Sequence, residues 1–500
     1  MKLLPILVSA PPHCEDLVSA ELDRSELKIT GRAGSRIEAE GSLECIYRFL
    51  IENRSASRLI FPVAAFEFST VDEFYHQINA LPWEEHIDSG KTLKIDGTGR
   101  SSLFPHTNFP VLKAKDAIVD RLRERTGKRP DIDTENPDLL LSVRVHEQEA
   151  QIGIDISGGA LHRRGYRRSG AKAPLKENLA AAILLRAEWP RIAAEGGGFI
   201  DPFCGSGTLV IEAALMAGRI PPRSLVPAPP SAGWKGHDQA LWRRLIGELE
   251  DLRRQRLTAL KEGPLRFFGS DKDPKAVKTA QANARSAGLE GIVSFSCTPV
   301  NRLELPDCTP GLICTNPPYG ERLESEAQAE LIYTDFGFSL RRRFSGWRCS
   351  FLAPDKEAGL ATGLHAQKSH SLANGPLKVL LLHTEVEEYR LSQGSEMFLN
   401  RLKKNRRQLK SYLKAWSETP FRLYDKDMPE YAFAVDIYPP SWCHLQEYAA
   451  PASIEARAVA RRRPSSSIWN RVRRGSSSRR GANSVRATAT DAGTQLKATK

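Results

Sequence analysis

The chain has 500 residues, of which 41% are hydrophobic and 26% are charged, and this composition is typical of a folded protein with two to four domains. It contains no run of 18 apolar residues, and its short apolar start is broken by Pro5, which argues against a membrane span and an export signal. Eight cysteines without a CxxC pair indicate neither a disulfide framework nor a metal site, so we expect a cytoplasmic protein.

The net charge of +12 is concentrated in one segment. Residues 457–500 contain ten arginines, two lysines and one aspartate, which leaves residues 1–456 close to neutral. Overall charge is therefore weak evidence that the rest of the chain binds nucleic acid. The segment is rich in Arg, Ser, Ala and Thr without periodicity, and we expect it to be disordered. It is either a basic RNA-binding arm or the product of a lost reading frame.

Residues 1–156 predict two small α+β units that divide near residue 44. The first has an apolar strand and a helix around residues 14–22. In the second, a segment at 43–63 has helical spacing followed by a strand. The further elements predicted here are helices at 71–83 and 111–127, a strand at 92–100 and a hairpin at 139–157.

From residue 174 onward, helical and strand patterns alternate, which predicts a doubly wound parallel sheet. The predicted helices are 175–189, 208–218, 240–263, 276–288 and 327–344. The predicted strands are 197–203, 265–271, 292–298, 311–316, 349–353 and 377–384. A proline-rich surface loop is expected at 220–234, and a basic helix at 397–416 followed by two strand-like runs is expected further on.

The first chemical signal is the segment DPFCGSG, which runs from Asp201 through Phe203 to Gly207 between a predicted strand and a predicted helix. Gly205 and Gly207 permit unusual backbone angles and a close approach of the backbone to a ligand. An ordinary tight turn is an equally good interpretation of this segment alone.

The second signal is Asp271, at the end of the next predicted strand. An acidic side chain there can accept hydrogen bonds from both hydroxyls of a ribose. The alternative role is capping of the following helix, which Asp273 fits better because it precedes Pro274. The long interval from Gly207 departs from the compact spacing of NAD-binding proteins.

The motif TNPPYGER at residues 315–322 follows a predicted strand and is the most specific signal. Two successive prolines stiffen the backbone and remove two N–H donors, while their carbonyls remain acceptors. The Asn316 amide oxygen and the Pro317 carbonyl would then accept the two hydrogens of a planar exocyclic amine, and Tyr319 would offer a face for stacking a base. A strand-ending turn without chemistry is the alternative, and the agreement with the other two signals argues against it.

Together these residues resemble those of class I S-adenosylmethionine-dependent methyltransferases that methylate amines, which are marked by (N/D)PP(Y/F). Over about residues 1–455, the chain is similar to the ribosomal RNA large subunit methyltransferase K/L family. The segments that carry this resemblance are LHRRGYR (161–167), APLKENLAAA (173–182), DPFCGSGTL (201–209), GSDKDP (269–274), ANARSAGL (282–289) and TNPPYGERL (315–323).

The resemblance implies an α/β fold, with a Rossmann-like class I methyltransferase sheet at 157–390. An α+β RNA-binding region would precede it, with a ferredoxin-like element at 1–44 and a THUMP domain at 45–156. The implied reaction is methylation of the N2 amine of a guanine in large-subunit (23S) ribosomal RNA, with S-adenosyl-L-methionine as cofactor and without DNA or a membrane as partner. Residues 391–456 are similar to only the beginning of the family's K half, so its N7-guanine activity is not expected.

The matched motifs imply roles for individual residues. The implied roles are cofactor binding by Asp201, Phe203, Gly205, Gly207, Asp271 and Asn316, and catalysis by Asn316, Pro317 and Tyr319. Four arginines of the approach loop would hold phosphates, unless the loop is merely solvated: Arg163, Arg164, Arg167 and Arg168. Lys176 and Glu177 either shape the methionine end of the pocket or are ordinary helix-surface residues. No acid follows the strand at 292–298, so the adenine contact falls to backbone groups or Asn301.

Other functions share these motifs. The NPPY motif also serves adenine-N6 DNA methyltransferases and glutamine-methylating enzymes, and the RNA-type domain with LHRRGYR argues against both. A tRNA guanine-N2 methyltransferase has the same pair of domains and is the nearest rival. A non-catalytic RNA-binding module is a further alternative, and the intact glycine loop and Asn316 argue against it.

Overall fold

A computed structural model describes most of the chain and divides it into two compact units. The described residues are 2–88, 90–167, 175–226, 233–319, 326–388, 393–415, 419–428, 431, 433–438, 442–448, 485–490 and 493–498. The first unit consists of residues 1–317, 347–356 and 365–385, and the second contains 318–346, 357–364 and 386–500.

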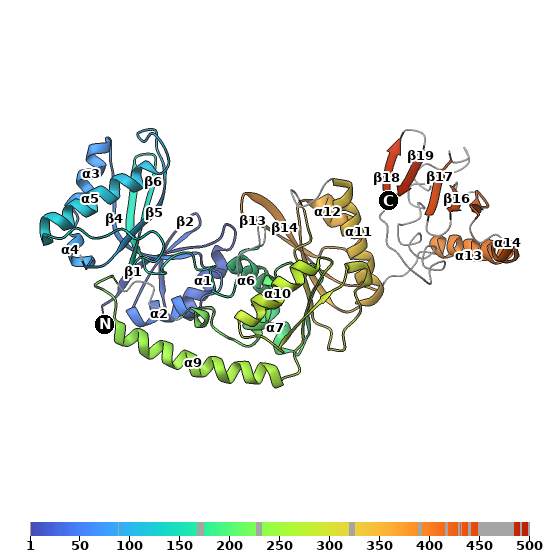
Figure 1. Cartoon of the computed structure of the whole chain (residues 1–500), viewed down its shortest axis with the longest axis horizontal. Helices are drawn as coiled ribbons and strands as arrows, with labels where there is room; N and C mark the ends of the chain where they lie inside the picture. Colours follow the sequence, from blue (N-terminus) through green and yellow to red (C-terminus); the bar gives the residue numbers. More distant parts are fainter. Residues whose placement is uncertain are drawn as a thin grey trace. The chain divides into compact units, whose positions relative to one another are not determined.

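The first unit begins with a seven-stranded sheet (Figure 1). Its strands are β1 (Leu4–Ser9), β2 (Lys28–Ala33), β3 (Arg36–Gly41), β4 (Arg58–Glu67), β5 (Leu93–Arg100), β6 (Leu139–His146) and β7 (Glu149–Asp155). Their order is β2-β3-β1-β4-β7-β6-β5. Because β1 pairs with both β3 and β4, the sheet continues across the boundary that we expected near residue 44.

Five helices accompany this sheet. They are α1 (Glu15–Arg24), α2 (Leu43–Glu52), α3 (Val71–Ala80), α4 (Trp83–His86) and α5 (Phe109–Thr126). Side-chain caps begin two of them, since Ser42 accepts a hydrogen bond from the Cys45 amide and Thr70 accepts one from the Glu73 amide. The helices and strands predicted for this region from apolar spacing are confirmed, because their apolar faces form one continuous core.

The second sheet of the first unit also has seven strands. They are β8 (Phe199–Asp201), β9 (Phe267–Asp271), β10 (Val293–Cys297), β11 (Leu312–Thr315), β12 (Arg348–Ala353), β13 (Lys368–Asn374) and β14 (Leu377–Glu385). Their order is β10-β9-β8-β11-β12-β14-β13, with β8 to β12 parallel and β13 and β14 antiparallel. Strand β13 was not predicted, because this edge strand is polar and buries fully only Leu372.

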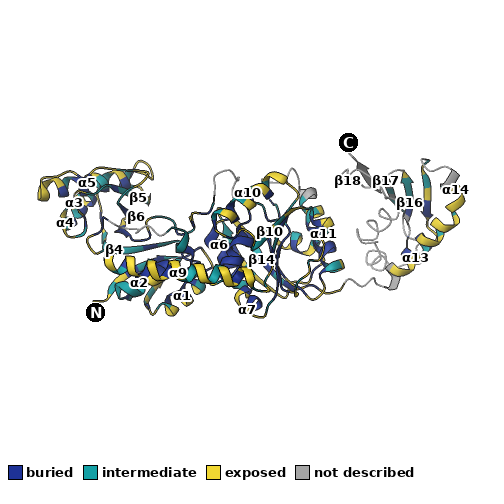
Figure 2. Ribbon diagram, turned by 60° about the horizontal axis from the view of Figure 1, so that its bottom comes forward, coloured by how far each residue is buried: buried dark blue, intermediate teal, exposed yellow. Residues whose placement is uncertain are grey.

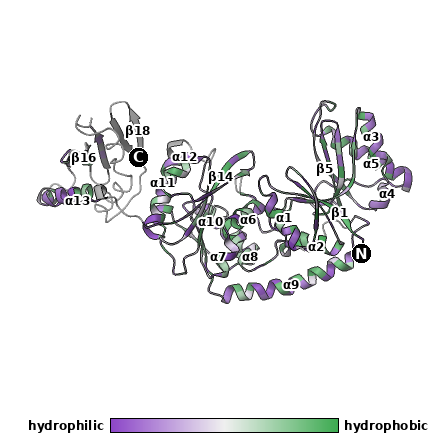
Figure 3. Cartoon of the chain, turned by 180° about the vertical axis from the view of Figure 1, so that it is seen from behind, coloured by the Kyte–Doolittle hydropathy of each residue, from purple (hydrophilic) through white to green (hydrophobic). Residues whose placement is uncertain are grey.

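The helices around this sheet differ in burial. They are α6 (Glu177–Arg186), α7 (Trp189–Ala194), α8 (Thr208–Ala217), α9 (Gln239–Glu262) and α10 (Pro274–Ser286). Helix α6 lies almost entirely inside the unit (Figure 2), as does α8. Helix α9 is amphipathic (Figure 3), and Trp242, Leu245 and Leu249 join the core of the N-terminal sheet. None of the helices in the described ranges is both long and apolar enough to cross a membrane.

The segment at 220–234 is not simply a surface loop, which corrects our prediction. It contains a 3-10 turn, η1 (Pro222–Leu225), and residues 227–232 lie outside the described ranges. Trp234 is only 5% exposed and its ring centroid lies 5.0 Å from that of Phe61. A tryptophan side chain buries a large apolar area when it packs. The free energy gained in this way outweighs the preference of the neighbouring polar residues for solvent.

The second unit contains helices and two small sheets. Its elements are α11 (Glu326–Arg343), α12 (Lys356–Ala361), α13 (Gln393–Gln408), α14 (Lys410–Ala415), β15 (Phe421–Asp425), β16 (Phe433–Tyr438), β17 (Trp442–Glu447), β18 (Val485–Thr490) and β19 (Gly493–Ala498). The predicted helix at 397–416 is therefore two helices. Strands β18 and β19 pair antiparallel, and the expected disorder of the segment 457–500 stays a prediction. The rest of 457–500 lies outside the described residues.

Candidate functional site

Three neighbouring parallel strands end at one edge of the second sheet. Strand β8 pairs with β9 on one side and with β11 on the other, and Asp201 lies opposite Gly269. A Cβ at Gly311, just before β11, would lie 2.0 Å from the carbonyl oxygen of Gly198, so glycine permits this close pairing. The three sequence signals therefore lie at the carboxyl ends of adjacent strands, where open α/β sheets bind ligands.

Asp201 is a buried carboxylic group at this edge. It is 2% exposed, and its Oδ1 accepts hydrogen bonds from the Thr315 hydroxyl at 2.5 Å and from the Phe203 amide at 3.1 Å. Burial raises the pKa of Asp201 to about 7, although these two hydrogen bonds oppose the shift. Asp201 thus ties the start of the glycine loop to the last residue of β11.

The raised pKa gives Asp201 a testable effect on stability. A carboxyl group with a raised pKa in the folded state stabilises the fold fully below its unfolded pKa, near 3.8, and loses that contribution as the pH rises through about 7. The isosteric Asp201→Asn variant stays neutral. We therefore expect its unfolding free energy, relative to wild type, to rise by about 2–3 kcal/mol between pH 5 and pH 8 in urea denaturation.

The control for this measurement is Asp72→Asn, which changes an exposed carboxylate in the first turn of α3. Its pH profile should run parallel to that of the wild type. Parallel profiles for all three proteins would show that Asp201 ionises normally in the folded chain and would refute the prediction.

The glycine loop is held by the carboxylate of Asp271. Asp271 Oδ2 accepts a hydrogen bond from the Gly205 amide at 3.0 Å, and its Oδ1 accepts one from the Asp273 amide at 3.0 Å. Each carboxylate oxygen has a second lone pair, so both still accept a hydroxyl donor. Asp273 caps α10 through the Lys275 amide, as the sequence predicted.

The two glycines of the loop adopt backbone angles that favour glycine. Gly205 has φ +51° and Gly207 has φ +82°. No atom lies within 4 Å of the position that a Cβ would take at Gly205, whereas at Gly207 it would approach Ala280 and Phe295 to 3.0 Å. The loop therefore presents open backbone at Gly205 and a tightly packed backbone at Gly207, where α8 begins.

Buried polar side chains form hydrogen bonds that hold the glycine loop in place. Asn283, on α10, is 1% exposed and donates to the carbonyl of Ser206 at 2.9 Å. Arg167 donates to the Thr208 hydroxyl at 3.1 Å and forms an ion pair with Glu177 at 2.9 Å. Glu177 is therefore buried and paired near the start of α8, not a helix-surface residue, whereas Lys176 is exposed.

The asparagine of the NPPY motif has an unused acceptor. Asn316 follows the last residue of β11, and its Oδ1 is buried without a hydrogen-bond partner among the described residues. A buried amide oxygen without a partner costs free energy, so it needs an explanation. Pro317 is also buried. A ligand with an N–H donor would satisfy Asn316.

Tyr319 belongs to the second unit and is 6% exposed. The structure does not present the open ring face that base stacking requires, so that role stays a prediction. Residues 320–322, which complete the motif, lie outside the described ranges.

The four arginines of the approach loop have different environments. Arg163 is exposed, as a phosphate contact requires. Arg164 is 4% exposed and donates to the carbonyls of Leu161 and Arg54, so the prediction that it contacts RNA is wrong. Arg167 forms the contacts with Thr208 and Glu177 that are described above. Arg168 lies outside the described residues.

Sequence reasoning missed two residues that shape this site. Thr315 belongs to the quoted motif but received no role, and Asn283 was treated as part of a similar segment only. A polar residue on the apolar face of a predicted helix is the signal that could have singled out Asn283. Asn301, one alternative for the adenine contact, is exposed in the 3-10 turn η2 (Val300–Arg302), and that role stays untested.

Family models match two parts of the chain. The model described as UPF0020, RMKL-like, methyltransferase domain matches residues 164–383. The THUMP domain model matches residues 68–155, which begins later than the boundary expected at 45.

Curated relatives resemble the chain over most of its length. Ribosomal RNA large subunit methyltransferase K/L of Syntrophotalea carbinolica is 43% identical over 474 residues, which cover 92% of this chain and 66% of the relative. The protein of the same name from Pseudomonas paraeruginosa is 39% identical and is matched over 91% of this chain and 66% of its own length. The chain thus spans slightly less than two thirds of these relatives.

Solved structures share the fold. The crystal structure of SMU.472 complexed with SAH has a TM-score of 0.66 and 28% sequence identity, covering 78% of this chain and 100% of that one. A Listeria monocytogenes protein named as a predicted N6-adenine-specific DNA methylase has a TM-score of 0.65 and 29% identity, covering 77% of this chain and 96% of that one. The candidate site therefore lies in a methyltransferase domain.

Proposed function

This chain belongs to the ribosomal RNA large subunit methyltransferase K/L family, and on that premise we propose that it transfers a methyl group from S-adenosylmethionine to the N2 amine of a guanine in large-subunit ribosomal RNA. The proposal concerns the methyltransferase domain at 164–383. It concerns this domain alone, and the chain spans 66% of the relatives' length.

The observation that carries the proposal is the Oδ1 of Asn316 at the tip of β11, which has no hydrogen-bond partner among the described residues. Thr315, its neighbour, donates to Asp201, which begins the glycine loop. The hydrogen bond from Thr315 to Asp201 therefore connects the strand end that carries the amine acceptor to the loop suited to a cofactor. This arrangement suits transfer of a group onto an exocyclic nitrogen.

The residues at the edge of the sheet suit S-adenosylmethionine. The free lone pairs of Asp271 are available to ribose hydroxyls, and the open backbone at Gly205 permits close approach of a ligand. The N-terminus of α8, capped by Gly207 without a side chain, leaves amide donors for the methionine carboxylate. When bound, the cofactor supplies an electrophilic methyl group on a sulfonium.

The chain's own residues orient the amine. The guanine N2 lone pair is delocalised into the ring, which makes this amine a poor nucleophile. By accepting its two N–H hydrogens, Asn316 Oδ1 and the Pro317 carbonyl direct the lone pair out of the plane toward the methyl group. Alignment of this kind contributes several kcal/mol to catalysis. No strong base is required before transfer, because proton loss becomes easy once the nitrogen is positively charged.

RNA recognition is proposed for the THUMP domain at 68–155, with Arg163 as a phosphate contact beside the site. Since the target base is paired or stacked in folded RNA, it must be extruded to reach Asn316.

The test is a transfer assay with tritiated S-adenosylmethionine and the full chain. Four acceptors are compared: unmodified 23S rRNA transcript, tRNA transcript, duplex DNA and a glutamine-containing peptide. We expect label in the 23S transcript, and nuclease digestion with mass spectrometry should identify N2-methylguanosine. Label in DNA as N6-methyladenine would support the function named for the Listeria relative and overturn the proposal. Absence of cofactor binding would favour a non-catalytic RNA-binding module.

A further inference from the structure

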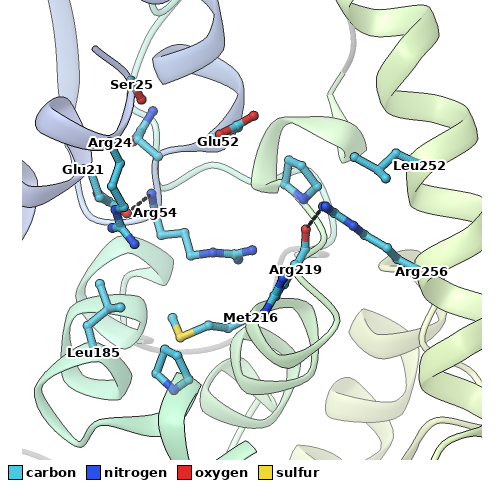
Figure 4. A pocket seen from close by; sticks show the side chains of 13 residues that line it. Glu21, Arg24, Ser25, Glu52, Arg54, Leu185, Met216, Arg219, Leu252 and Arg256 are labelled. Atoms are coloured by element: carbon cyan, nitrogen blue, oxygen red, sulfur yellow. Dashed lines mark hydrogen bonds between the residues drawn. The ribbon is translucent and has the colours of Figure 1, made fainter. Parts of the chain in front are cut away.

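A cavity of about 390 Å³ lies within the first unit, away from the glycine loop (Figure 4). It lies among the ends of α1, α2 and α8 and the middle of α9. The charged residues that line it are Glu21, Arg24, Glu52, Arg54, Arg219 and Arg256. Four of these are arginines, and we call the cavity the arginine pocket.

The four arginines come from four segments that are distant in the sequence. Arg24 ends α1, Arg54 follows α2, Arg219 follows α8, and Arg256 lies on α9. Among the residues that the structure describes, no carboxylate lies within 4.0 Å of any of these guanidinium groups. The fold therefore gathers four guanidinium groups without a close carboxylate partner around one cavity, which makes the local potential positive and attracts anions.

The acidic residues of the pocket offset these charges only in part. Glu21 is 6% exposed, and its carboxylate accepts hydrogen bonds from the Arg54 amide, the Ser55 amide and the Ser55 hydroxyl. Glu52 is exposed. Four guanidinium groups thus share the cavity with two carboxylates, which leaves an excess of positive charge.

Several guanidinium donors remain available. Arg54 uses Nη2 to bind the carbonyls of Leu215 and Ile220 at the end of α8, while its buried Nη1 has no partner among the described residues. Within the described part of the chain, Arg24 donates only through Nε, to the carbonyl of Ala20, and Arg256 only through Nη1, to the carbonyl of Arg219. Figure 4 shows the side chain of Arg54 extending into the space between Glu21 and Arg219.

Burial and neighbouring positive charges both lower the pKa of Arg54 and of Arg256. Burial lowers the pKa of Arg54 to about 10, with Arg164 and Arg24 adding to the effect and Glu212 and Glu21 opposing it. Burial and Arg219 also lower the pKa of Arg256, which Glu52 opposes. A bound anion would relieve both costs.

We propose that the arginine pocket binds a phosphate group of the RNA substrate. Guanidinium groups match phosphate oxygens in geometry and charge. No aromatic side chain lines the cavity, so it offers no platform for stacking a base and suits the backbone phosphate. This inference rests on the proposed function for the identity of the RNA.

The position of the pocket indicates what this phosphate contact does. The pocket lies at the C-terminal end of α8, whereas the glycine loop lies at its N-terminal end, and ten residues of helix span about 15 Å. A phosphate held there belongs to a nucleotide other than the target. The contact therefore positions the RNA without reading its sequence.

The test compares the full-length wild type with Arg24→Gln/Arg219→Gln, two exposed arginines whose guanidinium groups form no hydrogen bond to another element in the described ranges. Binding of unmodified 23S rRNA transcript is measured by filter binding at several KCl concentrations. Loss of two phosphate contacts should lower the slope of log Kd against log[KCl] by about 1.4–1.8 and weaken binding about tenfold at 100 mM KCl. Arg54 is left unchanged because it binds the end of α8.

The matched control is Arg254→Gln/Arg285→Gln, which removes the same charge from exposed arginines outside the pocket. Its slope should stay close to that of the wild type, and thermal unfolding shows that both variants are folded. Equal slopes for the pocket variant and the wild type, or equal losses for both variants, would overturn the proposal.

A second arm separates RNA from a free phosphate. Pyrophosphate is titrated calorimetrically into wild type and pocket variant. Micromolar binding that the pocket variant loses, with an unchanged RNA slope, would assign the pocket to a small phosphate compound and overturn the proposal. Because these readouts measure binding only, absence of methyl transfer by the wild type would refute the proposed function without affecting this result.

Discussion

Replacement of Asn316 by alanine is expected to lower kcat/KM for methylation of 23S rRNA transcript by about a thousandfold, while the Kd for S-adenosylmethionine changes by less than about threefold. The reason is the buried Oδ1 of Asn316, which has no partner among the described residues and is proposed to hold the reacting amine. Removing one preorganised polar group of an active site costs about 100- to 1,000-fold in rate. A thousandfold loss corresponds to about 4 kcal/mol of transition-state stabilisation.

Two further variants serve as controls for this prediction. Asn316→Asp retains an oxygen acceptor at the same position and should keep more activity than alanine does. Asn136→Ala changes an exposed asparagine of the N-terminal region and should behave as wild type. Steady-state kinetics with tritiated cofactor give kcat/KM, and calorimetry gives the Kd. Full turnover by the alanine variant would remove Asn316 from the mechanism.

Replacement of Asp271 by alanine is expected to raise the Kd for S-adenosylhomocysteine about 100-fold. Its carboxylate holds the Gly205 amide and the Asp273 amide, both at 3.0 Å, and is proposed to accept the ribose hydroxyls. The variant loses charge-assisted hydrogen bonds to the cofactor and leaves the loop amides without their acceptor. A 100-fold change corresponds to about 2.7 kcal/mol.

Asp273→Ala is the matched control, because Asp273 is two residues away and caps α10 with its side chain. Its loss should cost about 1 kcal/mol of stability and leave the Kd near that of the wild type. Calorimetric titration measures the Kd of both variants for S-adenosylhomocysteine under identical conditions. Equal affinities for the Asp271 and Asp273 variants would show that the carboxylate of Asp271 makes no contact with the cofactor.

Much of the site could be predicted because its determinants are local. The segment around Asp201, Gly205 and Gly207 lies between a buried strand and a helix, and parallel strands bring their carboxyl ends to one edge. Asp273 before Pro274 is recognisable as a helix cap from these two residues alone. Patterns of this kind depend on neighbours in the sequence, which are known before the fold is.

The errors concern residues whose environment is made by distant segments. Arg164 was expected at the surface with its neighbour Arg163, but the carbonyl of Arg54, 110 residues away in the sequence, accepts its hydrogen bond. Trp234 was placed in a surface loop, but Phe61 packs against it. No local pattern distinguishes a buried arginine or a packed tryptophan from an exposed one.

The sequence by itself therefore determined most of the helices and strands, the glycine loop, Asp271 and the Asn316 motif, because periodicity, turn residues and motifs are properties of contiguous residues. Only the tertiary structure decided that Thr315 holds Asp201, that Asp271 holds the glycine loop, and that four arginines share one cavity. The physical reason is that burial and electrostatic interactions depend on distances in space, and folding sets those distances between residues far apart in the chain.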